Sequence, residues 1–184
     1  MTNVHERPPD PAEEGLDAVV RFGPLPDSGM VARRLGDAVF VGCASPDYLD
    51  RYGTPATPDH LAHHRCLGYT TPWLGHFRDW VFADKGAVFT RQISGKLNVN
   101  SAEALLEAAL AGPGIAMVAA FVAHEAVKAG RLRVLLKDYI APGVPVSVLC
   151  PPGRQRTPRV RWFLDVLQEI IPSPPPWEEI TRSG

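Results

Sequence analysis

The order of apolar runs and chain breakers over residues 15–49 is the feature that most constrains the fold. Short apolar runs follow one another at 17–22, 31–35 and 38–43. The segment 23–29 separates the first two runs, and its two prolines and two glycines continue neither a strand nor a helix. Ser45 then stands directly before Pro46, which is typical of a helix N-terminus. This succession predicts an α/β fold that opens with strands.

The later part of the chain alternates strand-like and helix-like segments. An Asp-Lys-Gly turn at 84–86 between two apolar runs predicts a hairpin. In the strongest helix signal, Asn100 or Ser101 can be the cap, and Glu103 would form a capping-box-like pair with Asn100. Strand, helix, strand, helix and strand then follow one another over 97–136, which predicts a mostly parallel sheet covered by helices.

Composition and charge exclude several classes of protein. With 45% hydrophobic and 21% charged residues, the 184-residue chain is globular, and its formal net charge of −1 favours neither nucleic acid nor a membrane surface. Three cysteines without a close pair suit a reducing compartment. The N-terminus lacks the apolar core of a signal peptide, and no apolar stretch is long enough to span a membrane. We therefore expect a cytoplasmic protein without a membrane partner.

Four ordered segments resemble the effector-binding domain of LysR-type transcriptional regulators. They are D-x-x-x-R-x-G-P-L-P-D-S at 17–28, A-R-R-L-G at 32–36, C-A-S-P-x-Y-L at 43–49 and A-L-A-G-x-G-I-A at 109–116. The likeness continues through A-G-R-L at 129–132 to a closing helix near 158–171. The resemblance implies a two-lobed type 2 periplasmic-binding-protein-like fold, with a small acidic or polar effector bound in the cleft between the lobes.

The resemblance also implies how the chain is divided. The expected parts are a frayed N-terminus over 1–14, a first lobe made of 15–42 plus 145–171, a second lobe over 43–144, and a Pro-rich C-terminal tail over 172–184. In the family a strand, a helix and a second strand precede the part of the first lobe that is matched here. We therefore expect the first lobe to be incomplete.

The family's winged helix-turn-helix and linker helix have no counterpart in this sequence, so we expect an N-terminally truncated chain. DNA would then be reached only through a winged helix-turn-helix on another chain, by association with a full-length regulator, and a homo-oligomer is also expected. A misassigned start, a nonfunctional gene fragment and the solute-binding protein of a transporter remain alternatives.

Eight residues are predicted to bind the effector. They are Arg21, Phe22, Gly23, Asn100, Ser101, Ala119, Ala120 and Phe121. The helix start at Asn100-Ser101 offers free N–H groups and a positive dipole end to a carboxylate, with an ordinary helix cap as the alternative. Arg21 could pair with an acidic ligand, or it could make a structural ion pair. The resemblance places Phe121 and its neighbours on the opposite wall, with core packing as the alternative.

Other candidate chemistry has a simpler explanation. His60, His63, His64 and Cys66 lie close in sequence, but His64 would point away from a helical face shared by His60 and His63, so we expect no metal. The three cysteines stand in apolar runs, which favours buried, inert thiols.

The sequence contains no catalytic G-x-S-x-G or H-E-x-x-H motif and no glycine-rich phosphate loop. We expect neither an enzyme nor a cofactor, although a small enzyme that uses Cys43 or the histidines stays a rival hypothesis. A basic run could contact DNA, but a solvated surface is favoured; it consists of Arg154, Arg156, Arg159 and Arg161.

Overall fold

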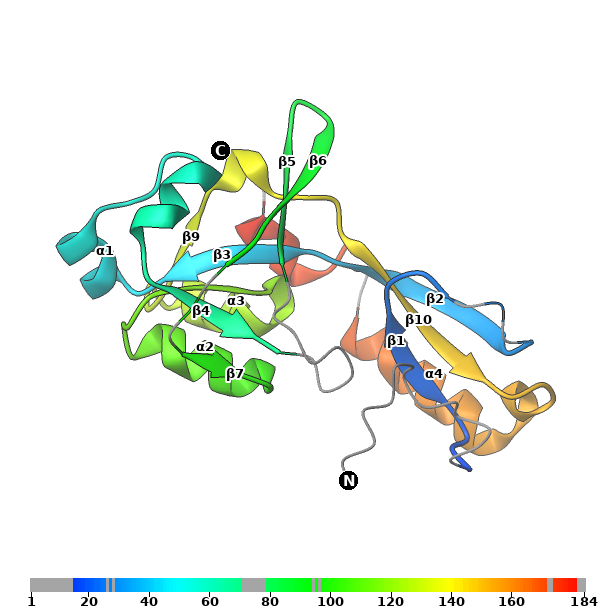
Figure 1. The fold of residues 1–184 in the computed structure, drawn as a ribbon. Helices are drawn as coiled ribbons and strands as arrows, with labels where there is room; N and C mark the ends of the chain where they lie inside the picture. The colour runs from blue at the N-terminus through cyan, green and yellow to red at the C-terminus, as the bar shows by residue number, and fades with distance from the viewer. Residues whose placement is uncertain are drawn as a thin grey trace, which may run out of the picture. The chain divides into compact units, whose positions relative to one another are not determined.

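The computed structural model describes residues 15–25, 27, 29–70, 79–93, 95, 97–171 and 174–181 (Figure 1). The chain divides into two compact units, which we call the large unit and the small unit. The large unit contains Val39–Pro142 and the segment that begins at Trp177, and the small unit contains the segment that ends at Ala38 and Gly143–Pro176. Among the described residues, no helix is long and apolar enough to cross a membrane.

A five-stranded sheet in the order β7-β4-β8-β3-β9 forms the centre of the large unit. Its strands are β3 (Phe40–Ala44), β4 (Cys66–Tyr69), β7 (Asn98–Val99), β8 (Ile115–Ala119) and β9 (Arg133–Leu135). β4 pairs in parallel with β7 and β8, whereas β8 and β9 each pair antiparallel with β3. Four strands therefore run in one direction, as the alternation of strands and helices predicts, and only β3 opposes them.

Two helices of the large unit, the first and second in chain order, start at a serine that caps them. The α-helices of this unit are α1 (Pro46–Tyr52), α2 (Ala102–Leu110) and α3 (Ala120–Lys128), with the 3₁₀ helices η1 (Pro58–His63) and η2 (Lys137–Tyr139). The Ser45 hydroxyl accepts a hydrogen bond from the Tyr48 N–H at 3.2 Å, which confirms the predicted cap of α1. At α2 the cap is Ser101, so the capping-box-like pair with Asn100 as the cap does not form.

The large unit has two buried clusters, one on each face of its sheet. Ile115 belongs to one cluster together with Tyr48 and Phe82, and the next residue, Ala116, belongs to the other together with Leu105. Because successive side chains of a strand point to opposite faces, this alternation along β8 places the two clusters on opposite sides of the sheet.

A hairpin joins β5 (Trp80–Asp84) to β6 (Ala87–Arg91), as the Asp-Lys-Gly turn predicts. Both turn residues have positive φ, 48° at Lys85 and 86° at Gly86, which is the backbone that a two-residue hairpin with a type I′ turn requires. Trp80 and Phe82 are buried and anchor the hairpin to the cluster of Tyr48 and Ile115.

The small unit pairs an antiparallel sheet with one long helix. The sheet order is β1-β10-β2, formed by β1 (Val19–Phe22), β2 (Val31–Ala38) and β10 (Val144–Cys150). The helix α4 (Pro158–Ile170) follows the 3₁₀ helix η3 (Arg154–Arg156). Val148 and Cys150 of the sheet form one buried cluster with Val160 and Leu164 of α4.

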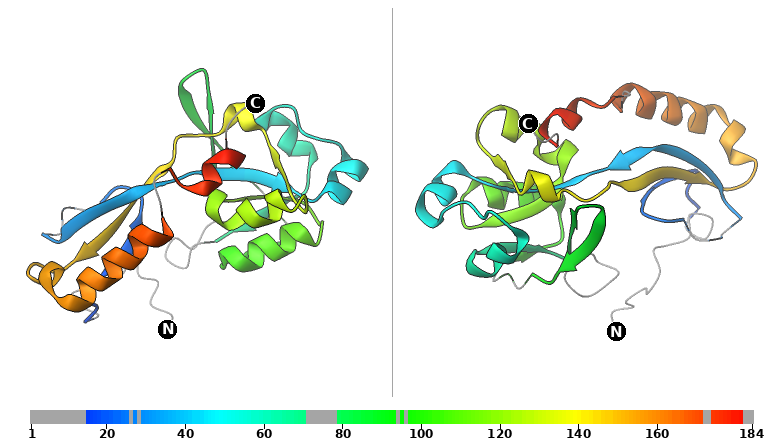
Figure 2. Two further views of the ribbon diagram at one scale, coloured as in Figure 1. Left: turned by 180° about the vertical axis from the view of Figure 1, so that it is seen from behind. Right: turned by 90° about the horizontal axis from the view of Figure 1, so that it is seen from above.

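The C-terminal segment is more ordered than a Pro-rich tail. Pro176–Ile180 forms the 3₁₀ helix η4, which both views of Figure 2 show in red beside α3. Ile180 is only 6% exposed and Trp177 packs against the same cluster as Leu105. The predicted Pro-rich tail therefore includes one short helix, because two large apolar side chains three positions apart supply a buried contact that the preceding prolines do not prevent.

Candidate functional site

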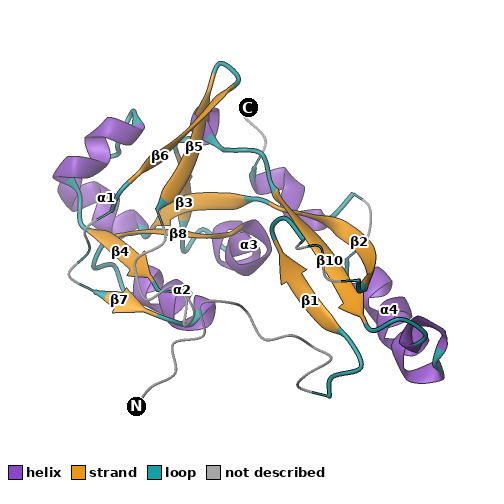
Figure 3. Cartoon of the chain, turned by 45° about the vertical axis from the view of Figure 1, so that its right-hand side comes forward, coloured by secondary structure: helices purple, strands orange, loops and turns teal. Residues whose placement is uncertain are grey.

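Two helices of the large unit begin at the same edge of its sheet. Since β7, β4 and β8 are parallel, their carboxyl ends meet at one edge, where open α/β sheets commonly bind ligands. α2 starts just after β7, and α3 starts directly after β8. Figure 3 shows α3 beside β8. We call this place the α2/α3 edge. It contains five of the eight predicted ligand-binding residues: Asn100, Ser101, Ala119, Ala120 and Phe121.

The start of α2 carries a polar pair. Ser101 Oγ accepts a hydrogen bond from the Ala104 N–H at 3.2 Å and donates one to Glu103 Oε2 at 2.7 Å. The second bond holds the pKa of the Glu103 carboxyl below its usual value. A carboxylate therefore already lies at the positive end of α2, so an incoming anion must compete with it.

The start of α3 is apolar. Ala119 is the N-cap, and no side chain in the described part of the chain caps the helix, while the Ala120 N–H donates to the Val39 carbonyl oxygen at 2.8 Å. Ala119 and Ala120 are 8% and 0% exposed, so their methyl groups belong to the core. Phe121 is 42% exposed and is the one predicted side chain of this wall that reaches the surface.

Thr70 also lies at this edge, although no sequence motif predicted it. It directly follows β4, and both its N–H and its hydroxyl donate to the Val99 carbonyl oxygen, at 2.9 and 3.4 Å. Thr70 is half-buried and lies at the end of β4, the strand between β7 and β8. In the sequence, Thr70 stands at the end of a predicted strand. That position places it at the candidate site only because β4 pairs with both β7 and β8.

The other three predicted residues belong to the small unit. Arg21 and Phe22 end β1, where Arg21 is half-buried and Phe22 is 51% exposed. The Gly23 N–H donates to the Pro145 carbonyl oxygen at 2.8 Å, and its φ of 95° suits glycine. Whether Arg21, Phe22 and Gly23 bind an effector stays a prediction.

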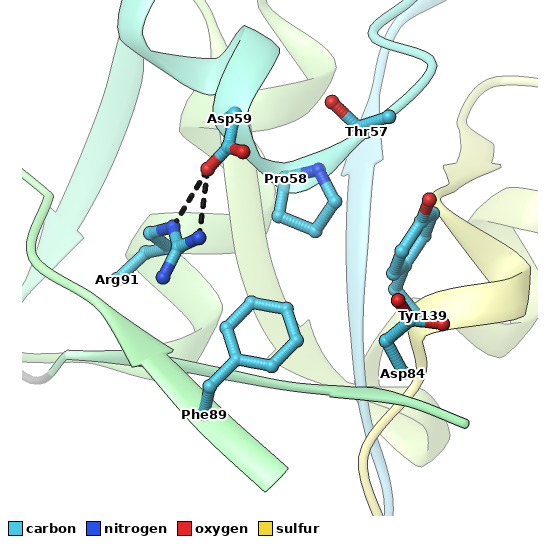
Figure 4. A pocket seen from close by; sticks show the side chains of 7 residues that line it. All are labelled: Thr57, Pro58, Asp59, Asp84, Phe89, Arg91 and Tyr139. Atoms are coloured by element: carbon cyan, nitrogen blue, oxygen red, sulfur yellow. Dashed lines mark hydrogen bonds and ion pairs between the residues drawn. The ribbon is translucent and has the colours of Figure 1, made fainter. Parts of the chain in front are cut away.

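A separate pocket of about 400 Å³ lies between η1, the hairpin and η2 in the large unit (Figure 4). It is lined by Thr57, Pro58, Asp59, Asp84, Phe89, Arg91 and Tyr139. Arg91 bonds Asp59 Oδ1 through Nε and Nη2 at 3.0 and 2.7 Å, and its guanidinium lies 4.7 Å from the centre of the Phe89 ring. Because Asp59 neutralises this cation and Asp84 adds a further carboxylate, the pocket suits an acidic ligand poorly.

The cysteines are buried, as the sequence predicts. Burial raises the pKa of the Cys43 thiol to about 12 and that of Cys66 to about 11. A nucleophilic cysteine needs a lowered pKa and access to solvent, so neither thiol supports the rival reading as an enzyme.

The histidines near Cys66 make structural contacts. His60 Nδ1 accepts from the Ala56 N–H at 3.3 Å, and His64 Nδ1 lies 3.2 Å from the Tyr48 hydroxyl. That hydroxyl also accepts from the Arg65 N–H at 2.9 Å. In the described part of the chain, no three His, Cys, Asp or Glu side chains converge as metal ligands.

The basic run around η3 is exposed and one of its members is paired. Arg154 makes an ion pair with Asp17, and Arg156, Arg159 and Arg161 are exposed. This arrangement is typical of a solvated surface.

Comparison with known proteins gives a consistent result. The family model described as the LysR substrate binding domain matches residues 1–171. The uncharacterized HTH-type transcriptional regulator YhjC of Escherichia coli K12 is 40% identical over 168 residues, which are 91% of this chain and 56% of YhjC. The HTH-type transcriptional regulator CrgA of Neisseria meningitidis serogroup C is 35% identical over 161 residues, which are 86% of this chain and 52% of CrgA.

Solved structures extend the likeness to the fold. The regulatory domain of CrgA from Neisseria meningitidis has a TM-score of 0.76 at 33% identity, covering 88% of this chain and 78% of that domain. The full-length virulence activator AphB of Vibrio cholerae, at 24% identity, shares the fold with a TM-score of 0.73 over 89% of this chain and 54% of AphB. The chain spans about half the length of the curated regulators named above.

Proposed function

The chain belongs to the LysR substrate-binding domain family, a family of transcriptional regulators and not of enzymes, and on that premise we propose that it senses a small polar or acidic metabolite. The observation that carries the proposal is the α2/α3 edge. There the starts of two helices and the Thr70 hydroxyl meet at the carboxyl ends of three parallel strands.

The contacts at this edge favour particular ligand chemistry. The hydroxyl groups of Ser101 and Thr70 donate to Glu103 and to the Val99 carbonyl oxygen, so an anionic ligand would displace these two bonds, and Phe121 offers an exposed apolar ring. Because Glu103 already holds the Ser101 hydroxyl, a ligand with one anionic group fits better than a densely charged one. A small organic acid with an apolar portion satisfies both requirements. Arg21, Phe22 and Gly23 are the proposed contribution of the small unit.

Ligand binding would act on transcription through other parts of a regulator. A ligand changes an equilibrium only when it binds two arrangements with different affinity. We propose that effector binding biases such an equilibrium in an oligomer or in an association with a full-length regulator. DNA would be reached through winged helix-turn-helix domains in that assembly, and the protein would work in the cytoplasm.

A metabolite panel tests the proposed function. Thermal unfolding of the chain is measured with small organic acids, sugars and amines at millimolar concentration, and we expect at least one acid to raise the Tm. The matched variants are Thr70→Val at the edge and Thr90→Val on the exposed hairpin. Thr70→Val should abolish the rise and Thr90→Val should keep it. A rise that survives both Thr70→Val and Ser101→Ala would place the ligand elsewhere and contradict the proposal.

A further inference from the structure

The C-terminal helix η4 lies beyond the part of the chain that the family model covers. The match ends at residue 171, whereas η4 spans Pro176–Ile180. The domain family therefore gives this segment no role. Figure 2 shows η4 beside α3, and its residues from Trp177 on belong to the large unit with α3.

The first contact between η4 and α3 is apolar. Ile180 is 6% exposed and joins the buried cluster that contains Ala120 and Ala123 of α3. The ring centres of Trp177 and Phe121 lie 5.8 Å apart in an edge-to-face arrangement, which is a favourable geometry for aromatic pairs. The segment therefore contacts the first turn of α3 directly.

The second contact is polar. His124 of α3 is 7% exposed, and its Nε2 lies 2.7 Å from Glu179 Oε1 while its Nδ1 lies 3.2 Å from Glu125 Oε1. A buried imidazole needs hydrogen-bond partners, and η4 supplies the shorter of these two contacts. The bond from His124 lowers the pKa of the Glu179 carboxyl, and Lys128 acts in the same direction.

The third observation is what α3 lacks. Among the residues that the structure describes, no side chain caps its start, and a nine-residue helix is marginal without tertiary contacts. Contacts from outside the helix must therefore hold its first turns, and η4 contacts Phe121 in the first turn and His124 in the next.

We propose that Trp177, Glu179 and Ile180 are positioning residues that fix the first turns of α3 and thereby set the place of Phe121 at the effector site. The effector role of Phe121 rests on the proposed function, but the hold of η4 on α3 does not. The segment acts through α3 and need not touch the ligand itself.

Backbone hydrogen exchange of the ligand-free chain tests this hold. Trp177→Ala should speed the exchange of the hydrogen-bonded amides 120, 124 and 125 by about tenfold or more, with little change in α1 of the same unit. Trp162→Ala is the matched control, because Trp162 is 70% exposed on α4. Trp177→Phe keeps an aromatic ring and should restore most of the protection. Unchanged exchange at amides 120, 124 and 125, or an equal increase in α1 and α3, would overturn the proposal.

A charge variant gives an independent measurement. Glu179→Gln preserves the size of the side chain but removes its charge, and it should speed exchange at α3 by a smaller factor than Trp177→Ala. Glu169→Gln, an exposed carboxylate change on α4, should leave α3 unaffected. These exchange measurements use no ligand, so they can support the hold of η4 on α3 even if no metabolite raises the Tm. Conversely, unaltered exchange in the variants would contradict the hold of η4 without contradicting the proposed function.

Discussion

In the large unit a five-stranded sheet carries buried clusters on both faces, whereas in the small unit a three-stranded antiparallel sheet shares one buried cluster with a single long helix. The largest side chains that are almost completely buried in the large unit are Tyr48, Ile115 and Leu132. In the small unit, the side chains buried to the same degree are the smaller Val148 and Val160. Because a small core removes less apolar surface from water, we infer that the small unit opens more readily.

The largest expected effect comes from truncating each core in turn. Leu105 on α2 is 2% exposed, and Leu105→Ala should lower the free energy of unfolding of the large unit by about 2–5 kcal/mol. Leu164 on α4 is 7% exposed, and Leu164→Ala should cost about 2–3 kcal/mol. Native-state hydrogen exchange at α2 and α4 measures each loss where it occurs. If Leu164→Ala weakened both helices equally, the two units would unfold together and the comparison would fail.

The next effect tests the parallel pairing that the large unit has and the small unit lacks. A Cβ added at Gly114 would lie 2.3 Å from the Arg65 carbonyl oxygen, so Gly114→Ala must push β8 away from the chain before β4. We expect a loss of about 1–3 kcal/mol from overpacking. Gly42→Ala is the control, since its Cβ would meet only the Leu135 oxygen at 4.0 Å. Chemical unfolding measures both, and equal losses would contradict this explanation.

A smaller effect concerns the buried hydroxyl of the large unit. Tyr48→Phe removes the acceptor of the Arg65 N–H and should cost about 1–2 kcal/mol, because that donor loses its partner. Tyr52→Phe changes the same atom on a side chain that is 49% exposed and should be nearly neutral. Urea unfolding of the two variants gives the difference, and a neutral Tyr48→Phe would show that solvent replaces the lost acceptor.

Local signals predicted the elements of both units but not their partners. Lys85-Gly86 predicted its hairpin because few other sequences tolerate two successive positive φ angles, and Ser45 predicted its cap because the bonded groups are three residues apart. The opposed direction of β3 depends on pairing with strands far along the chain, so no local pattern contains it.

The same limit applies to the candidate site. Ser101 and Phe121 were predicted as ligand-binding residues, whereas Thr70 becomes part of the edge only through the neighbours of β4. Asn100 and Ser101 can both cap a helix, and the bond from the Ala104 N–H to Ser101 decides between them. The sequence did not predict the packing of η4, because the run of prolines before Trp177 indicates irregular structure, and the spacing of Trp177 and Ile180 alone is too short a pattern to predict a helix.

Acid should weaken the contact between Glu179 and His124 in the large unit. The folded chain holds the pKa of Glu179 below its ordinary value of about 4.3, so the stabilisation is complete above that pH and is lost as the pH falls through the lowered pKa. The Tm of the native chain should therefore exceed that of Glu179→Gln at pH 7, and the gap should close toward pH 3. A gap that stays constant with pH would mean that the charge of Glu179 contributes nothing.

The smallest effect belongs to the ion pair of the small unit, between Arg154 and Asp17. The side chains of this pair are 52% and 37% exposed, whereas the His124 side chain in the large unit is 9% exposed. Since water and salt screen exposed charges, Asp17→Asn should cost about 0–1 kcal/mol, and the loss should vanish near 1 M NaCl. Asp165→Asn on exposed α4 is the control for the change in net charge. Chemical unfolding at low and high salt measures the difference. A loss that persists in high salt would mean that the pair is shielded from solvent, and that the small unit is better packed around β1 than its single buried cluster indicates.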